Sequence, residues 1–228
     1  MEYVIFSSGG GANDFGDHRL MSSGAGIGHA ADGVRGLLAG GYNAPANLNT
    51  IDFITIATTG NSSSFGEFDD GSTGAYSPMA SHTRAVFARG GQNLNFINFT
   101  SGGKTQIFGD MRGDSRTSHI ASCSSSTRGI MAGGEAPSRV NTITFITLAT
   151  LGNGTDFGDL LAGRNDHDAV SSSTRGFVVA GNDASSNKLN VIEFVTISTT
   201  GNAADFGDLT QARSQPSSCS DVHGGLGD

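Results

Sequence analysis

The 228-residue sequence contains no tryptophan, 4 prolines and 2 cysteines, and its only lysines are Lys104 and Lys188. Two cysteines cannot form the disulfide framework that stabilises small secreted domains. No hydrophobic run approaches the roughly 18 residues of a membrane-spanning helix. An acid, Glu2, stands where a signal peptide would carry its positively charged region. We therefore expect a soluble protein that is not directed to a secretory pathway.

Positive charge is also scarce. The formal net charge is -8 at pH 7. Such a surface repels the phosphate backbone, so nucleic-acid binding by counterion release is disfavoured. It also disfavours attachment to anionic membranes. We expect no nucleic-acid partner and no membrane insertion.

Glycine, in contrast, is abundant. The 35 glycines are about twice the usual share of a globular chain. The chain is nevertheless 36% hydrophobic, with Phe, Ile, Val and Leu in short runs, which argues against disorder. The glycines are therefore expected to be turn residues.

A Phe-Gly dipeptide recurs five times, at steps of 43 to 50 residues. Twelve residues before each of its phenylalanines stands another aromatic, five residues before it stands a glycine, and an acid follows each dipeptide. The dipeptides are Phe15-Gly16, Phe65-Gly66, Phe108-Gly109, Phe157-Gly158 and Phe206-Gly207. The aromatics are Tyr3, Phe53, Phe96, Phe145 and Phe194, and the glycines are Gly10, Gly60, Gly103, Gly152 and Gly201. The acids are Asp17, Glu67, Asp110, Asp159 and Asp208.

Four of the repeats also contain an arginine followed by a hydrophobic run that ends in glycine. These arginines are Arg35, Arg84, Arg128 and Arg175. Together with the alternating stretch at residues 49–58 and its counterparts, the pattern gives four short strands per repeat. Repeats of this length with four strands are typical of β-propeller blades.

We therefore predict an all-β protein, a single five-bladed β-propeller that spans residues 1–228. The expected blades are residues 18–67, 68–110, 111–159, 160–208, and 209–228 together with 1–17. The last blade would take two strands from each end of the chain. Such closure removes sheet edges that would otherwise invite aggregation.

The order of these features resembles the kelch repeat. A strand that begins with Arg-Gly and ends in Gly-Gly is followed by the strand that carries the repeated aromatic. An arginine and a histidine then follow, as in Arg116 with His119 and Arg164 with His167. Kelch repeats usually carry Trp where this chain has the Phe of Phe-Gly-Asp. The sequence segments TIDFITIATTGN and SSSTRG are also similar to segments of the degenerate kelch-like arrays of marine bacteriophages, notably cyanophages. That resemblance implies a virion or tail-associated protein, assembled in the host cytoplasm.

No catalytic, metal or cofactor site is predicted. The Asp-Phe-Gly-Asp tetrads lack the other motifs of a kinase, and the six histidines show no metal-ligand spacing. Cys123 and Cys219 occupy one repeat position and are expected to be small buried side chains. The repeated acids and arginines are expected to pair within or between neighbouring blades and cap backbone groups. The alternative is a cation site or a substrate channel.

Function is expected where the repeats differ, in the loops after Gly-Gly and after Phe-Gly-Asp, which would emerge on one face. This candidate binding face holds seven of the 13 basic residues. Its residues are Arg19, Tyr42, Asn43, Asp69, Asp70, Gln92, Arg112, Arg116, Glu135, Arg139, Arg164, Asp166, Lys188 and Arg213. The sequence predicts a non-enzymatic interaction module that docks to another virion protein or to a host-surface receptor or glycan. The alternative is a lectin with repeated shallow sites between blades.

Overall fold

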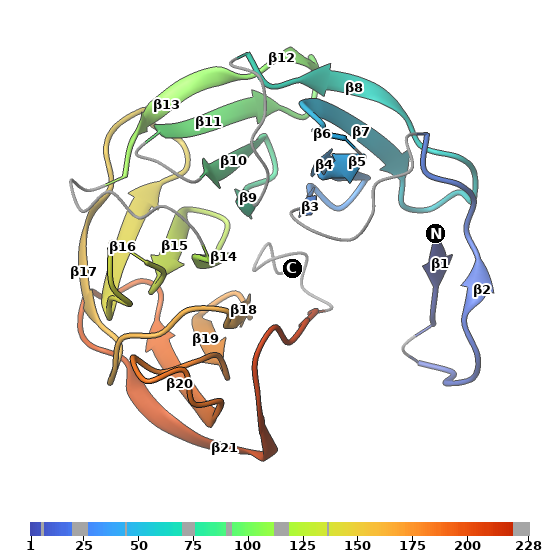
Figure 1. Ribbon diagram of the computed structural model, residues 1–228. Helices are drawn as coiled ribbons and strands as arrows, with labels where there is room; N and C mark the ends of the chain where they lie inside the picture. The colour runs from blue at the N-terminus through green and yellow to red at the C-terminus, as the bar shows by residue number, and fades with distance from the viewer. Residues whose placement is uncertain are drawn as a thin grey trace.

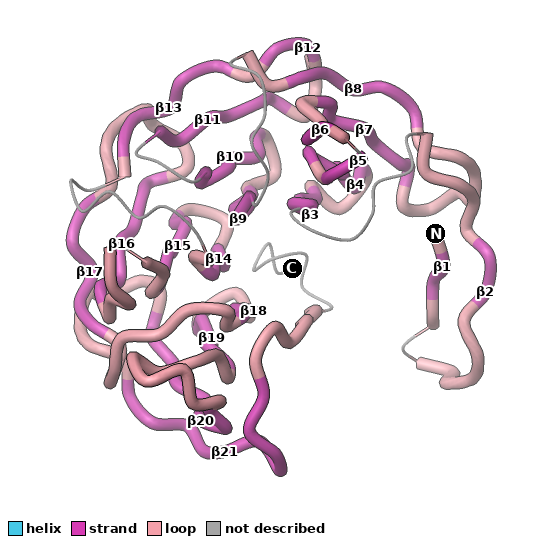
Figure 2. Tube along the Cα trace, viewed as in Figure 1, coloured by secondary structure: helices cyan, strands magenta, loops and turns pink. Residues whose placement is uncertain are grey.

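The computed structural model describes residues 1–5, 7–19, 27–43, 45–69, 76–89, 93–111, 119–135 and 137–220. These residues form β-strands, turns and loops (Figures 1 and 2), and no helix occurs among them. It follows that the described part of the chain has no helix long and apolar enough to cross a membrane. The all-β class predicted from the sequence is confirmed.

Most strands belong to four larger sheets. Sheet 1 contains β3 (Ile27–Ala31), β4 (Arg35–Gly40), β7 (Thr50–Thr55) and β8 (Ser63–Glu67), with β12 (Gly103–Lys104) added in parallel at its edge. Sheet 2 contains β9 (Tyr76–Ala80), β10 (Arg84–Arg89), β11 (Asn93–Asn98) and β13 (Gln106–Asp110). Sheet 3 contains β14 (Ala121–Ser124), β15 (Arg128–Ala132), β16 (Thr142–Thr147) and β17 (Thr155–Asp159). Sheet 4 contains β18 (Asp168–Ser171), β19 (Arg175–Val179), β20 (Leu189–Thr196) and β21 (Ala204–Arg213).

Two short hairpins complete the fold. The N-terminal hairpin consists of β1 (Glu2–Tyr3) and β2 (Asn13–Asp14), and the second consists of β5 (Tyr42–Asn43) and β6 (Ala46–Asn47). The four sheets stand side by side in an arc, with β3, β9, β14 and β18 on its inner side (Figure 1). The N-terminal hairpin lies at one end of the arc and β21 at the other. Among the described residues, no strand pairing joins these two ends.

The repeated aromatic sets the register of the two outer strands of each sheet. It pairs with the residue ten positions further along the chain, across the turn that contains the repeated glycine. The pairs are Tyr3–Asn13, Phe53–Ser63, Phe96–Gln106, Phe145–Thr155 and Phe194–Ala204. The N-terminal hairpin therefore has the same register as the outer half of every larger sheet.

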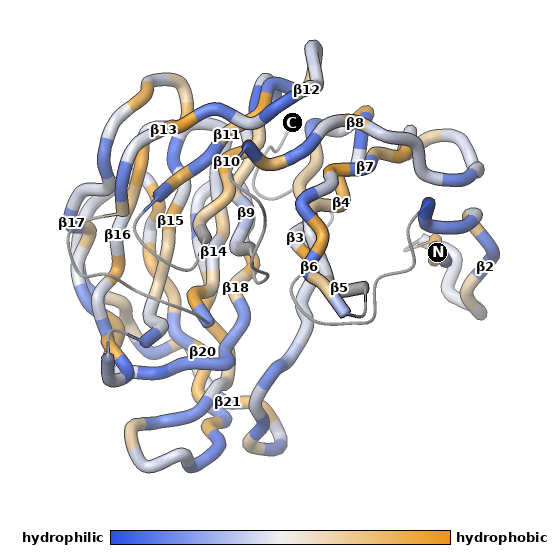
Figure 3. Tube along the Cα trace, turned by 45° about the horizontal axis from the view of Figure 1, so that its top comes forward, coloured by the Kyte–Doolittle hydropathy of each residue, from blue (hydrophilic) through white to orange (hydrophobic). Residues whose placement is uncertain are grey.

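The hydrophobic core lies between neighbouring sheets. One cluster joins sheets 1 and 2, a second joins sheets 2 and 3, and a third joins sheets 3 and 4. In the third, Ile130 and Phe157 of sheet 3 belong to the same buried cluster as Val178 and Val195 of sheet 4. Figure 3 shows hydrophobic and hydrophilic residues interspersed along these strands, as expected when each sheet buries residues against its neighbours. Each sheet thus depends on an adjacent sheet for its burial.

The glycine of the Phe-Gly dipeptide lies where the backbones of two neighbouring sheets approach each other closely. Gly158 has φ +148, and a Cβ built there would overlap the carbonyl of Gly201 in the next sheet. The Gly201 N–H donates a 2.7 Å hydrogen bond to the Phe157 carbonyl, and the Ala203 N–H donates a 2.8 Å bond to the Asp159 carbonyl. Gly16 and Gly109 approach the next hairpin glycine in the same way. The repeat therefore needs glycine here for space, and at Gly16 and Gly158 also for a positive φ.

Serine hydroxyls join the inner strands of neighbouring sheets. Ser122 donates to the Pro78 carbonyl at 2.8 Å, and Ser171 donates to the Ser124 carbonyl at 2.8 Å. The inner strands surround a cavity of about 670 Å³ that residues 216–220 also line. Cys123 is buried as expected, but Cys219, on this last segment, is exposed. The prediction of a buried Cys219 is wrong here because no described strand covers it.

Candidate functional site

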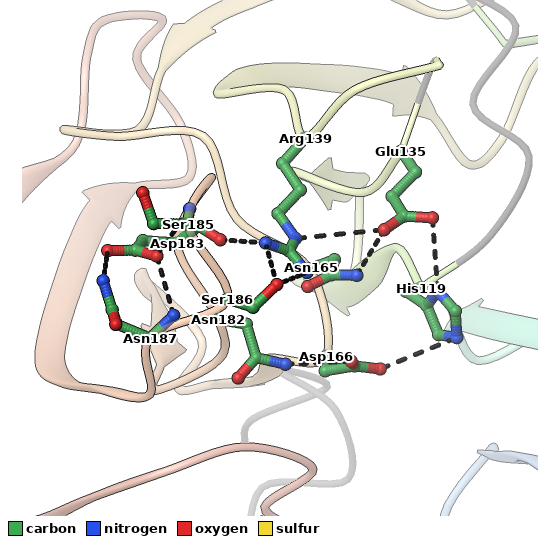
Figure 4. A network of polar contacts seen from close by, with 10 residues as sticks. All are labelled: His119, Glu135, Arg139, Asn165, Asp166, Asn182, Asp183, Ser185, Ser186 and Asn187. Carbon is green, nitrogen blue, oxygen red and sulfur yellow. Dashed lines mark hydrogen bonds and ion pairs between the residues drawn. The ribbon is translucent and has the colours of Figure 1, made fainter.

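A polar network lies on the loops of sheets 3 and 4 (Figure 4). It comprises His119, Glu135, Arg139, Asn165, Asp166, Asn182, Asp183, Ser185, Ser186 and Asn187. Its residues come from the loops after Gly-Gly and from the connections that lead into β14 and β18. The two loop sets that the sequence predicts on one face are therefore brought together in this part of the molecule.

His119 stands between two carboxylates. Its Nε2 lies 3.6 Å from Asp166 Oδ1, and its Nδ1 lies 4.0 Å from Glu135 Oε2. Asn165 donates a 2.6 Å hydrogen bond to Glu135, and Asn182 donates a 3.0 Å bond to Asp166. His119 and Asp166 both have positive φ, at +57 and +51, where they lead the chain into the inner strands. These contacts hold partly exposed polar groups of two sheets in one arrangement.

Arg139 links the loop of sheet 3 to that of sheet 4. Its guanidinium donates to the Asp183 carbonyl and, at 3.1 and 3.2 Å, to Ser186 Oγ. The Asp183 carboxylate in turn accepts bonds from the Asn187 side chain at 3.0 Å and from the N–H groups of Asn187 and Ser185. These hydrogen bonds, first that of the Asn187 side chain, lower the pKa of Asp183. The loop at residues 183–187 is thereby fixed by its own side chains.

Arg164, which directly precedes Asn165 of the network in the chain, belongs to a buried ion pair. Arg164 is 1% exposed and Glu193 is fully buried. The Arg164 guanidinium donates a hydrogen bond to the Glu193 carboxylate, and the two form an ion pair. Arg164 also donates to the Ala180 carbonyl at 3.3 Å, while Glu193 accepts from the Leu161 N–H at 2.9 Å. Burial lowers the pKa of the Arg164 guanidinium to about 10. The prediction that Arg164 belongs to an exposed binding face is wrong, because its guanidinium is buried in an ion pair with Glu193 of sheet 4.

His167 is buried next to this pair. Its Nε2 lies 3.0 Å from the Ala132 carbonyl of sheet 3. Burial lowers the pKa of His167 to about 4, and the nearby Arg164 acts in the same direction. The imidazole is therefore neutral in the folded protein at pH 7 and donates a hydrogen bond across the two sheets.

This buried histidine makes folding sensitive to acid. An unfolded histidine binds its proton near pH 6.5, whereas folded His167 does so only near pH 4, so the unfolded chain binds more protons in between. We expect the free energy of unfolding to fall by about 2 kcal/mol between pH 7 and pH 5 because of this residue. Urea unfolding at both values measures the loss. His167→Gln keeps a donor for Ala132 and should remove that part of the pH dependence, whereas an equal loss in this variant would contradict the assignment.

Other residues of the candidate binding face make contacts elsewhere. Arg19 binds the buried Asp52 through two nitrogens at 2.7 and 3.0 Å, and Asp69 accepts a 3.1 Å bond from Asn95. Lys188 is exposed at the edge of the loop before β20. Arg213 is the last residue of β21. Strand β5 consists of Tyr42 and Asn43. Four further residues of this prediction, Asp70, Gln92, Arg112 and Arg116, fall outside the described residues.

The repeated arginines and acids do not pair with each other among the described residues, so the predicted pairing is corrected. The guanidinium groups of Arg84, Arg128 and Arg175 stack on the aromatic of their own sheet at 4.7 to 5.0 Å from its ring centre. Arg128 donates a 3.0 Å bond to the Ile197 carbonyl of the next sheet, and Arg35 binds the Phe99 carbonyl in the same manner. A guanidinium ion can make both contacts because its flat face stacks on an aromatic ring while the N–H groups at its edge donate to a carbonyl.

Three of the five repeated acids make their contact through the backbone. Asp17, Asp110 and Asp159 each donate an N–H bond of 2.8 to 3.0 Å to an asparagine that follows the hairpin glycine of the next sheet. Glu67 faces a different residue, because Lys104, not asparagine, follows the hairpin glycine Gly103 of the next sheet. The side chains of Glu67 and Lys104 form an ion pair of 3.2 Å. Asp208, on β21 at the end of the arc, makes no such contact within the described residues. These positions are therefore parts of the junctions between sheets.

In the described ranges, no group of three or more His, Cys, Asp or Glu side chains is placed to hold a metal ion. The polar network presents hydrogen-bond donors, acceptors and charged side chains. No protein-family model and no curated protein sequence matches the chain.

Proposed function

We propose that the chain is a five-bladed, kelch-like β-propeller and that it acts as a non-enzymatic interaction module. The N-terminal hairpin supports the fifth blade, because it repeats the register of the outer half of each larger sheet. Residues 216–220 support it as well, because they line the cavity together with the four inner strands. The fifth blade would combine these two segments.

The exposed side chains at the two ends of the arc support the same ring. Phe206 is 55% exposed, although its counterparts Phe108 and Phe157 are 3% and 2% exposed. Val4 is 53% exposed, whereas its counterpart Val195 is 4% exposed. A fifth blade would bury both residues, as the junction of sheets 3 and 4 buries Phe157 and Val195. Burial of such side chains stabilises a fold by about 1.5–3 kcal/mol each.

The polar network on sheets 3 and 4 carries the proposal of an interaction surface. Its side chains are fixed by contacts between two sheets, so a partner would meet an ordered surface and lose little free energy in ordering it. Glu135 and His119 keep 32% and 44% of their side chains exposed. We propose that the partner is another virion protein or a host-surface receptor, with the chain associated with the virion.

Binding to individually purified virion proteins and to a glycan array tests this proposal. We expect one virion protein or receptor to bind, and Glu135→Arg to weaken binding at least about tenfold by reversing a charge on the network. Thr199→Arg is the matched control, because Thr199 lies in the turn at the opposite end of β20 and is exposed. Binding to several glycans at equivalent sites would favour a lectin instead. Equal loss in both variants would contradict the network as the binding surface.

A further inference from the structure

The residue just before the repeated aromatic is polar and buried in all four larger sheets. These residues are Asp52, Asn95, Thr144 and Glu193, each at most 2% exposed. A buried polar group needs a partner. In sheets 1, 2 and 4 the partner comes from the connection between the preceding Phe-Gly dipeptide and the inner strand. We call this pairing the connection contact.

In sheets 1 and 4 the connection contact is an ion pair between a buried acid and an arginine of the connection. Asp52 of sheet 1 binds Arg19, and Glu193 of sheet 4 binds Arg164. In sheet 2 the neutral Asn95 donates to an acid of its connection, Asp69. The connection therefore carries an arginine in both of these sheets where the buried residue is an acid. This complementarity allows the partner of an acid at the same position to be inferred from the sequence.

Both members of a connection contact occur in the fifth repeat. Glu2 precedes Tyr3, just as Glu193 precedes Phe194, and Arg213 follows Phe206 by seven residues, just as Arg164 follows Phe157. We infer that Glu2 and Arg213 form the ion pair of the connection contact in the closing blade. This inference rests on the proposed five-bladed ring, not on its partner. It moves Arg213 from the candidate binding face to the closing junction.

The described contacts leave both side chains available. Arg213 is exposed, and its Nε donates only to the Gln211 carbonyl of its own strand, at 3.4 Å. Glu2 is exposed on β1 at the other end of the arc. The connection that carries Arg213 is already held on sheet 4, because the Gln215 N–H donates a 2.7 Å bond to the Asp166 carbonyl. Opposite charges therefore stand on the two segments that the ring would bring together.

The hairpin of the same chain is the favoured occupant of this junction. It is tethered to sheet 1 by the hydrogen bond from the Gly60 N–H to the Phe15 carbonyl, at 2.7 Å. A tethered segment binds with a high effective concentration, so closure within one chain precedes exchange between two chains. The junction would also place Gly207 against Gly10, as Gly158 stands against Gly201. Gly207, unlike its counterpart Gly158, has no other atom within 4 Å of a built Cβ.

A charge-reversal cycle tests the pair. Glu2→Arg and Arg213→Glu should each lower the Tm by about 2–4 °C or more, and the double variant should recover most of that loss. Lys188→Glu is the matched control, because it makes the same charge change at an exposed position of sheet 4. Combined with Glu2→Arg, it should give additive losses. Additive losses in the Glu2–Arg213 cycle would overturn the inferred ion pair.

A fluorescence measurement separates failure of the pair from failure of the ring. The chain has no tryptophan, so Phe206→Trp creates a single reporter at the junction. We expect the blue-shifted emission of a buried indole at all protein concentrations, a red shift on adding Glu2→Arg, and recovery in the variant that also carries Arg213→Glu. Solvent-exposed emission throughout would overturn the ring as well. A blue shift that appears only as the concentration rises, with a dimer on size-exclusion chromatography, would mean hairpin exchange and overturn closure within one chain.

Discussion

Gly158→Ala should lower the free energy of unfolding by at least about 3 kcal/mol. Alanine at φ +148 is strained by about 1–2 kcal/mol. Its Cβ would also overlap the Gly201 carbonyl, so sheets 3 and 4 must move apart. That movement breaks the 2.7 Å hydrogen bond between the Gly201 N–H and the Phe157 carbonyl. Urea unfolding measures the loss.

Gly201→Ala is the matched control for that variant. Its φ is +159, and no atom lies within 4 Å of a built Cβ, so it should lose only the cost of backbone strain. If the two variants lost equal stability, close approach of the sheets would not be the reason for glycine at Gly158. Gly207→Ala is informative in the same series. It should behave like Gly201→Ala in an open arc and like Gly158→Ala in a closed ring.

Glu193→Gln should lower the free energy of unfolding by about 3–5 kcal/mol. The change keeps the shape of the side chain but leaves the buried guanidinium of Arg164 without its counter-charge. Breaking a buried ion pair from one side is costly for this reason, because the remaining charge stays desolvated. Thermal or urea unfolding at pH 7 gives the magnitude.

Two comparisons give this prediction a definite outcome. Asp208→Asn removes the same charge from an exposed position of the same sheet and should change stability by no more than about 0.5 kcal/mol. The double variant Arg164→Met and Glu193→Leu removes both charges together and should recover most of the loss. A double variant as unstable as Glu193→Gln would show that shape, not unpaired charge, dominates at this place.

The sequence predicts the sheets well because their register depends on local features. The spacing between an aromatic and the following Phe-Gly dipeptide fixes both the turn and the pairing, so Phe145 and Phe157 could be assigned to adjacent strands. The predicted four strands per repeat are found in sheets 2, 3 and 4, whereas sheet 1 gains β12 as a fifth strand from the turn of the next repeat. Closure of the ring stays a prediction, because it depends on contacts between segments at opposite ends of the chain.

The polar residues could be predicted less well because their partners come from other loops. Arg164 was expected on an exposed loop, yet it is buried against Glu193. A signal was present, since Glu193 occupies the same repeat position as Asp52, Asn95 and Thr144, all polar on an otherwise hydrophobic strand. The polar network offers no comparable signal, because the loops that form it differ from one repeat to the next.

The close approach of Gly158 to Gly201 also defines the unit that tandem duplication would copy. The two halves of this junction lie on neighbouring sheets, but both fall within one stretch of chain from a Phe-Gly dipeptide to the next. An in-frame copy of such a stretch would carry a dipeptide and the hairpin glycine that fits it, and so would contain both halves of this backbone junction. One complete backbone junction therefore occupies one repeat length, which is 49 residues in each of the last two steps of the array.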